Sequence, residues 1–140
     1  MIDSIKLGFK KGIETTWMLA KIIVPVYIFV TILKHTPLIH WIASIFQPFM
    51  GLFDLPGEAV IVLVVGNVLD PYAAIGAMKA INLTSAQITT LAVMVGLSHS
   101  LFIESAIVKN LGLNMAMVSS IRMGLALVFG VLVGKVGGII

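Results

Sequence analysis

The stretch LPGEAVIVLVVGNVLDPYAA, residues 55–74, decides how this chain can fold. Residues 59–69 carry no charge and are almost all apolar, yet a Pro-Gly-Glu turn precedes them and Asp70-Pro71 follows them. A helix of about 11 residues is roughly 16 Å long, and the hydrocarbon core of a bilayer is about 30 Å thick. The pattern therefore predicts a helix that is interrupted at membrane depth.

The composition of the whole chain places it in a membrane. Hydrophobic residues make up 59% of the 140 residues and charged residues only 11%, whereas a soluble domain carries about 25% charged residues. A soluble fold of this size could not bury so much apolar surface, because much of its own surface must face water. We therefore expect a multi-pass integral membrane protein in the cell membrane, formed as one compact unit.

Missing residue types and motifs exclude several functions. The chain has no cysteine, which excludes disulfides, thiolate metal sites and cysteine nucleophiles. Its net charge of +3 comes from scattered lysines, whereas nucleic-acid binding requires basic residues clustered on one face. The sequence has no HExxH, GxSxG or glycine-rich phosphate loop. We expect no enzyme activity, no catalytic residues, no metal site, no cofactor and no nucleic-acid partner.

Hydrophobic periodicity and capping residues divide the chain into helical segments. Residues 1–16 have one apolar and one charged face, which suits a helix at the headgroup level or a solvated helix extension. Residues 57–81 form the interrupted segment, which either spans the membrane or is re-entrant. The remaining segments are a span at 17–34, an interfacial helix at 38–53, and spans at 84–109 and 114–138. Thr84 and Gln87 have the spacing of a capping box at the start of the span 84–109. The predicted fold is an all-α polytopic membrane protein with an N-terminal amphipathic helix, three to four transmembrane helices and one broken or re-entrant helix.

The interruption itself suggests a local structure. Asp70 can cap a second half-helix whose first residue is Pro71. Gly66 and Asn67 can end the first half-helix, because both tolerate a left-handed backbone. Backbone groups freed at such a break must be buried in protein or line a wet cavity, and broken helices of this kind form the substrate sites of many transporters. A kink satisfied by neighbouring helices is the alternative.

More polar side chains fall near the middle of the predicted span 84–109. Ser98, His99 and Ser100 lie near its midpoint, and Glu104 shares a face with Ser100 because the two are four residues apart. Arg122 is predicted at a depth similar to that of Glu104, so an ion pair between them is an alternative to a binding role. For His99 the alternative is a core histidine that is hydrogen-bonded to a hydroxyl group.

Small residues recur every four positions in the last predicted span. Ala126, Gly130, Gly134 and Gly138 form this small-residue stripe, and such spacing lets membrane helices approach each other closely. The stripe suits either a dimer interface or packing within one subunit.

Three stretches of the sequence occur in a familiar combination: the opening GFKKGIETTWMLAKIIVPVYIFV, then GLFDLPGEAVIVLVVGNVLDPYAAIGAM, then SHSLFIESAIVKNLG. Together they resemble the small stand-alone members of the Gate, or nucleoside recognition, family over nearly the whole chain. Related segments occur in concentrative nucleoside transporters, in ferrous-iron transporters and in spore-maturation proteins A and B. The ferrous-iron transporters have a cysteine near the break, which this chain lacks, so the resemblance disfavours iron transport.

The resemblance implies a single Gate-type membrane domain over residues 1–140. It also implies which residues belong to the substrate-binding region. With the polar groups described above, the predicted set is Glu58, Asn67, Asp70, Ser98, His99, Ser100 and Glu104.

The predicted function is a small membrane transporter half that binds or moves a small polar solute, nucleoside-like by resemblance, at a broken-helix site. Large transporters of this kind contain paired copies of such a unit, so we expect a homodimer or a pair with a homologue, in contact with membrane lipids. If residues 57–81 are re-entrant, the lysines are nearly balanced between the two sides, which allows an antiparallel dimer; if they span, the bias favours a parallel one. The alternative function is a non-transporting membrane scaffold or accessory subunit, and a lipid- or cell-wall-processing enzyme is a third.

Overall fold

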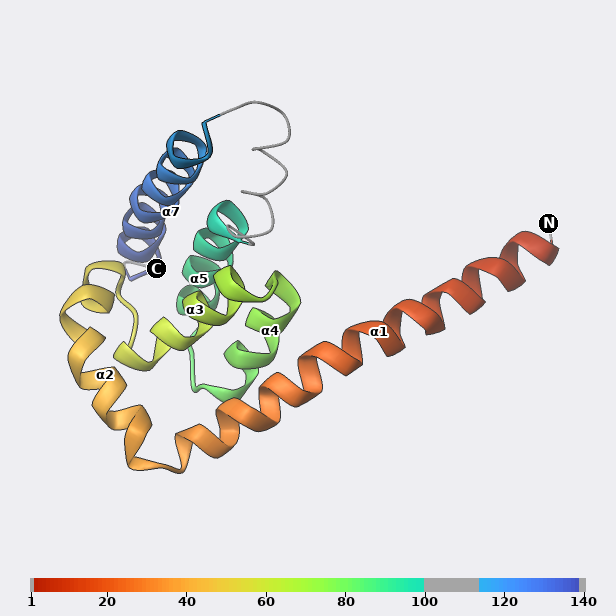
Figure 1. Ribbon diagram of the computed structural model, residues 1–140, viewed down its shortest axis with the longest axis horizontal. Helices are drawn as coiled ribbons and strands as arrows, with labels where there is room; N and C mark the ends of the chain where they lie inside the picture. Colours follow the sequence, from red (N-terminus) through yellow and green to blue (C-terminus); the bar gives the residue numbers. More distant parts are fainter. Residues whose placement is uncertain (1, 100–113, 139–140) are drawn as a thin grey trace.

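The computed structural model describes residues 2–99 and 114–138, and this part of the chain is helical, with no β-strand. The predicted all-α fold is therefore confirmed for these residues. Figure 1 shows α2, α3, α4, α5 and α7 gathered in one body, from which the N-terminal half of α1 extends freely. The elements are α1 (Ile2–Lys34), α2 (Pro37–Met50), η1 (Gly51–Phe53), η2 (Gly57–Ala59), α3 (Val60–Val68), α4 (Pro71–Ala80), α5 (Ser85–Ser98) and α7 (Met115–Gly137).

Two of the described helices are long and apolar enough to cross a membrane. They are Asp3–Lys34 of α1 and Met115–Gly137, which is α7. A bent pair, Pro37–Phe53 with Gly57–Val68, turns by 90° and is either a third, broken span or a re-entrant loop. This bend lies earlier in the chain than the break predicted within 57–81, at the turn that contains Asp54, whose φ of 55° is left-handed.

Helix α1 joins the segments predicted at 1–16 and 17–34, which agrees with the alternative that residues 1–16 extend the following helix. The helix is continuous from Ile2 to Lys34 and passes through Pro25. No capping residue interrupts it at this point, since the Thr16 hydroxyl donates to the Gly12 carbonyl within the helix, at 2.8 Å. At about 1.5 Å per residue α1 is roughly 50 Å long, longer than the hydrocarbon core is thick.

The structure describes only the first part of the span predicted at 84–109. Helix α5 begins behind the predicted Thr84–Gln87 capping box, but it ends at Ser98 because His99 has an extended ψ of 153°. The Ser98 hydroxyl donates to the Met94 carbonyl at 2.8 Å, and His99 Nδ1 lies 3.0 Å from the Gly96 carbonyl oxygen. Such side-chain bonds compete with the helical ones. Residues 100–113 lie outside the described part of the chain.

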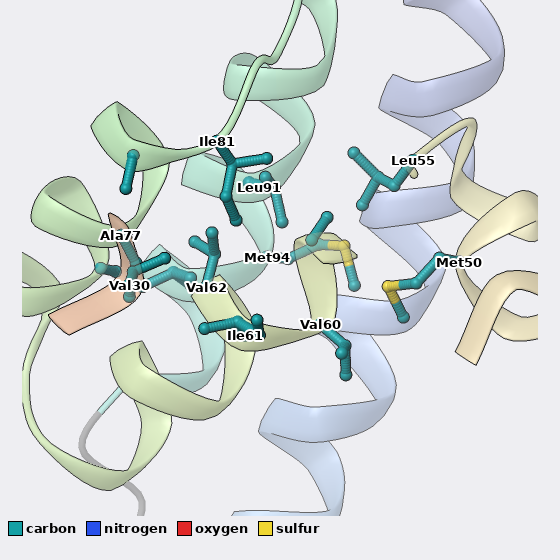
Figure 2. Close-up of a cluster of buried hydrophobic side chains, with 14 of the residues drawn as sticks. Val30, Met50, Leu55, Val60, Ile61, Val62, Ala77, Ile81, Leu91 and Met94 are labelled. Carbon is teal, nitrogen blue, oxygen red and sulfur yellow. The ribbon is translucent and has the colours of Figure 1, made fainter. Parts of the chain in front are cut away.

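The core lies where α3 crosses α4 and α5. Val30 from α1, Val62 from α3, Ala77 from α4 and Leu91 from α5 are completely buried. Figure 2 shows these side chains close together, with Met94 extending the cluster toward Val60 and Met50. Because the cluster joins four helices, the short α3 and α4 are held by packing more than by their own length.

Glycines let the helices of this body approach one another more closely than side chains would allow. A Cβ on Gly76 of α4 would lie 2.7 Å from the Ile23 carbonyl oxygen of α1, and one on Gly134 of α7 would overlap the Phe53 backbone. Ala126, Gly130 and Gly134 of the small-residue stripe are all buried. This part of the stripe therefore serves packing within the subunit, which was one of its two predicted roles.

Two substitutions on α7 test this packing and should have opposite effects. Gly134→Ala should destabilise the protein by about 1–3 kcal/mol, because the added methyl group overlaps the Phe53 backbone. Gly124→Ala is the matched control, since a Cβ there meets nothing within 4 Å. Alanine should stabilise a helix at this position by roughly 0.5–1 kcal/mol. Thermal unfolding of the purified variants in detergent measures both, and equal effects would contradict the packing described.

Candidate functional site

The break between α3 and α4 lies at Leu69 and Asp70, within the region predicted from the sequence. Asp70 has an extended backbone, and its Oδ1 accepts a hydrogen bond of 2.9 Å from the Ala73 N–H. Pro71 is the first residue of α4. The predicted N-cap is therefore confirmed, and its side chain satisfies one backbone donor that the break exposes.

The first half-helix ends differently from the prediction. Gly66 and Asn67 lie within α3, and the helix ends through Leu69, with φ −97° and ψ −92°. The helix therefore ends without a left-handed residue. Gly66 has a role in packing against α5. A Cβ on Gly66 would lie 2.9 Å from Val95 Cγ1 of α5, so glycine lets α3 contact α5 closely.

Asn67 is the most unusual polar residue of the break. Its side-chain Nδ2 donates to the Leu63 carbonyl one turn earlier, at 2.8 Å. Its Oδ1 is buried and has no hydrogen-bond partner among the described residues. A buried acceptor without a donor costs about 1–3 kcal/mol, so this oxygen can be stabilised by any donor that enters the break.

The end of α5 lies beside this break. Gly66 contacts Val95, and Ser98 follows one turn later on α5, where it is only 2% exposed. Figure 1 shows the ends of α3 and α5 at the same end of the body. Because Gly66 contacts Val95, Asn67 and Ser98 lie on neighbouring turns of α3 and α5. That Asn67, Asp70, Ser98 and His99 form one binding site stays a prediction.

Three other predicted site residues are not placed there. Glu58 lies in η2, before α3 begins, and is separated from Asn67 by nine residues, or about 13 Å of helix. Its side chain is half-buried and makes no hydrogen bond to any described residue. Ser100 and Glu104 lie outside the described residues, so the predicted pair between Glu104 and Arg122 does too.

Among the described residues, Arg122 has a partner that the sequence did not indicate. Its Nε donates to the Leu97 carbonyl of α5, at 3.0 Å. This carbonyl belongs to the last turn of α5, where no intrahelical donor follows. A cation at this place is also stabilised by the negative end of the helix dipole. Arg122 therefore closes the end of α5 from the neighbouring α7.

A second group of polar side chains surrounds the turn between η1 and η2. The Gly57 N–H donates to Gln47 Oε1 of α2, at 2.8 Å. Gln87 Nε2 of α5 donates to the Asp54 carbonyl, at 3.3 Å. Next to this turn lies a small cavity of about 220 Å³, whose polar lining comes from Asp54, Thr84, Gln87 and Thr90. The sequence analysis missed these contacts, although an isolated glutamine in an apolar segment is a signal for them.

Among the described residues, no three His, Asp or Glu side chains lie close enough to hold a metal ion. Among the described residues, the polar groups at the break include the Asn67 amide and the Asp70 carboxylate. Such a set can bind an uncharged polar molecule, with Asn67 and Asp70 as acceptors.

Comparison with known proteins agrees with this architecture. The sequence profile described as "Nucleoside recognition", that of the Gate family, matches residues 16–137. The chain is 40% identical over 129 residues to the uncharacterized membrane protein YvoD of Bacillus subtilis (strain 168). The alignment covers 92% of this chain but 41% of YvoD, so the chain spans about two fifths of the length of that relative. No solved structure matches the chain.

The N-cap at the break can be tested by two substitutions at one position. Asp70→Ala should lower the stability by about 0.5–2 kcal/mol, because the Ala73 N–H loses its acceptor. Asp70→Asn keeps an acceptor oxygen and should retain most of the stability. Thermal unfolding in detergent separates the two. An equal loss in both variants would mean that the negative charge, and not the cap, stabilises the break.

The role of Arg122 predicts a further difference. Arg122→Met should lower the folded yield and the unfolding temperature, because the Leu97 carbonyl loses its donor, at a cost of about 1–3 kcal/mol. Lys11→Met is the control, since Lys11 is exposed on the free half of α1. Size-exclusion chromatography of detergent extracts gives the yield. A normal yield for Arg122→Met would show that the end of α5 does not depend on α7.

Proposed function

Because this chain belongs to the Gate, or nucleoside recognition, family of membrane proteins, we propose that it is one half of a small transporter for a polar solute. The solute would bind where the α3–α4 break meets the end of α5. The observation that carries the proposal is the buried Asn67 Oδ1, which has no donor among the described residues. A nucleoside has N–H and O–H groups that can supply that donor.

The other groups near the break suit the same class of solute. Asp70 offers a carboxylate of which Oδ1 holds the Ala73 N–H. The Ser98 hydroxyl donates to Met94 and keeps its capacity to accept. These groups offer acceptors to a neutral polar ligand, and half-helix ends of this kind bind substrates and ions in known transporters.

The proposal includes a second unit, because the larger transporters that the sequence resembles contain paired copies of such a unit. The part of YvoD outside the alignment is longer than this chain, since the alignment covers 41% of YvoD. A partner of similar size, either a second copy or a homologue, would place two such breaks face to face. An antiparallel pair would reproduce the inverted repeats of larger transporters.

A membrane scaffold is the second candidate function, and one observation favours it. The break is partly closed by its own residues, since the Leu69 N–H donates to Val65 at 2.9 Å and Asp70 caps α4. A groove of about 370 Å³ begins at Pro71, and its lining is apolar except for Lys79. A dry, internally paired break would suit a structural role.

Asn67 decides between the two functions. The wild-type protein should be stabilised against heat by nucleosides such as uridine or adenosine and should take them up in proteoliposomes. Asn67→Ala should weaken nucleoside binding about tenfold or more, because one desolvated hydrogen bond is lost. Asn82→Ala is the matched control, since Asn82 is exposed in the connection between α4 and α5.

The results separate the proposals clearly. If the wild-type protein neither responds to nucleosides nor transports them, the scaffold function replaces the transporter function. If wild-type protein responds and Asn67→Ala responds equally, the protein transports but its site lies elsewhere. The cavity beside Asp54 would then be the next place to test.

A further inference from the structure

A long apolar groove runs between α7 and the segment formed by α2 and η1. Its volume is about 730 Å³, and every residue that lines it is apolar. Both walls carry large side chains that are partly exposed, among them Phe49 at 61% and Val128 at 57%. The walls are formed chiefly by Phe46, Phe49 and Phe53 on one side and by Leu127, Val128 and Val131 on the other.

One lysine lies in line with this groove on α7. Val128, Val131 and Lys135 are three, four and seven residues apart, so they share one face of the helix. Lys135 is exposed, and no described residue forms an ion pair with it. Helical side chains lean toward the N-terminus of their helix, and this direction leads from Lys135 back to the groove.

The surrounding residues place the Lys135 end of the groove at the membrane–water boundary. Gly138 follows α7, and a Cβ on it would lie 2.9 Å from Asp54 Oδ2. The Asp54 carbonyl accepts from Gln87, which belongs to the exposed Thr84 capping box. Polar groups therefore gather at this end of α7, whereas the groove extends from it along apolar helix surface.

We propose that the groove is a binding site for an anionic phospholipid, with an acyl chain between α2 and α7 and the phosphate beside Lys135. The charge of Lys135 complements the phosphate, and the apolar walls complement the chain. A phospholipid supplies both groups in this order along the membrane normal. The assignment is independent of the transported solute, because the α3–α4 break contributes no residue to the groove.

Lipid titration of the purified protein tests the site. Phosphatidylglycerol and phosphatidylcholine with identical acyl chains are added in detergent, and bound lipid is counted by native mass spectrometry. The wild-type protein should prefer phosphatidylglycerol. Lys135→Gln should weaken phosphatidylglycerol binding about fivefold, the contribution of one lysine near a membrane surface, and leave phosphatidylcholine binding unchanged. Val128→Trp should fill the groove and weaken both lipids.

Lys10→Gln is the control, because Lys10 is exposed on the free half of α1; it should behave as the wild type. The proposal is overturned if the wild type has no preference or if Lys135→Gln keeps it. It is also overturned if Val128→Trp splits a dimer while lipid binding persists, which would give the groove to a second copy. If Val128→Trp does not fold, the phosphatidylglycerol affinity of Lys135→Gln tests the proposal, because Lys135 is exposed.

Discussion

In an apolar environment no water can satisfy the ends of a helix, and this chain has many helix ends. At several junctions between the described helices, the structure meets this constraint with polar side chains. Asp70 closes the start of α4, and Arg122 closes the end of α5 from across the body. Further side chains bond to helix ends in the same way: Thr36 at the end of α1, Gln47 at η2, Thr84 with Gln87 at α5, and Asn114 at α7. Short helices have more ends per residue than long ones. Many of the few polar side chains in this chain therefore bond to helix ends.

Glycines that allow close helix packing are the second feature that stabilises these short helices. A helix of nine or ten residues, such as α3 or α4, gains little from its own hydrogen bonds. Such a helix must be stabilised by packing against neighbouring helices. Gly66 and Gly76 allow those helices to approach closely. Gly134 does the same where α7 rests on the turn after α2. The α3–α4 break is thus held by close helix contacts, and it contains the buried Asn67 Oδ1, which has no hydrogen-bond partner among the described residues.

The features that the sequence predicted correctly are those that depend on neighbours along the chain. Asp70-Pro71 and the Thr84–Gln87 box each contain all the atoms of their own cap, so the pattern is enough to recognise them. The features that it missed depend on distant residues. Gln87 reaches the Asp54 carbonyl 33 positions away, and Arg122 reaches Leu97 across 25 positions. For the same reason only part of the candidate site follows from the sequence: the pattern indicates the α3–α4 break at Asp70, whereas the contact of Gly66 with Val95 of α5 and the place of Glu58 before the start of α3 depend on the packing of the helices.

The straightness of α1 also determines how motion would pass through the molecule. Its body end is fixed where Gly76 of α4 rests on the Ile23 carbonyl, and Ile5 lies 18 residues farther along, or about 27 Å away. A tilt of roughly 10° at that contact would move Ile5 by about 5 Å, since the helix has no joint between them. Helix α4 begins at the break and contacts α1 through Gly76. A small rearrangement of the break would therefore produce a large displacement of the N-terminal end of α1. The position of the free half of α1 would then depend on the conformation of the break.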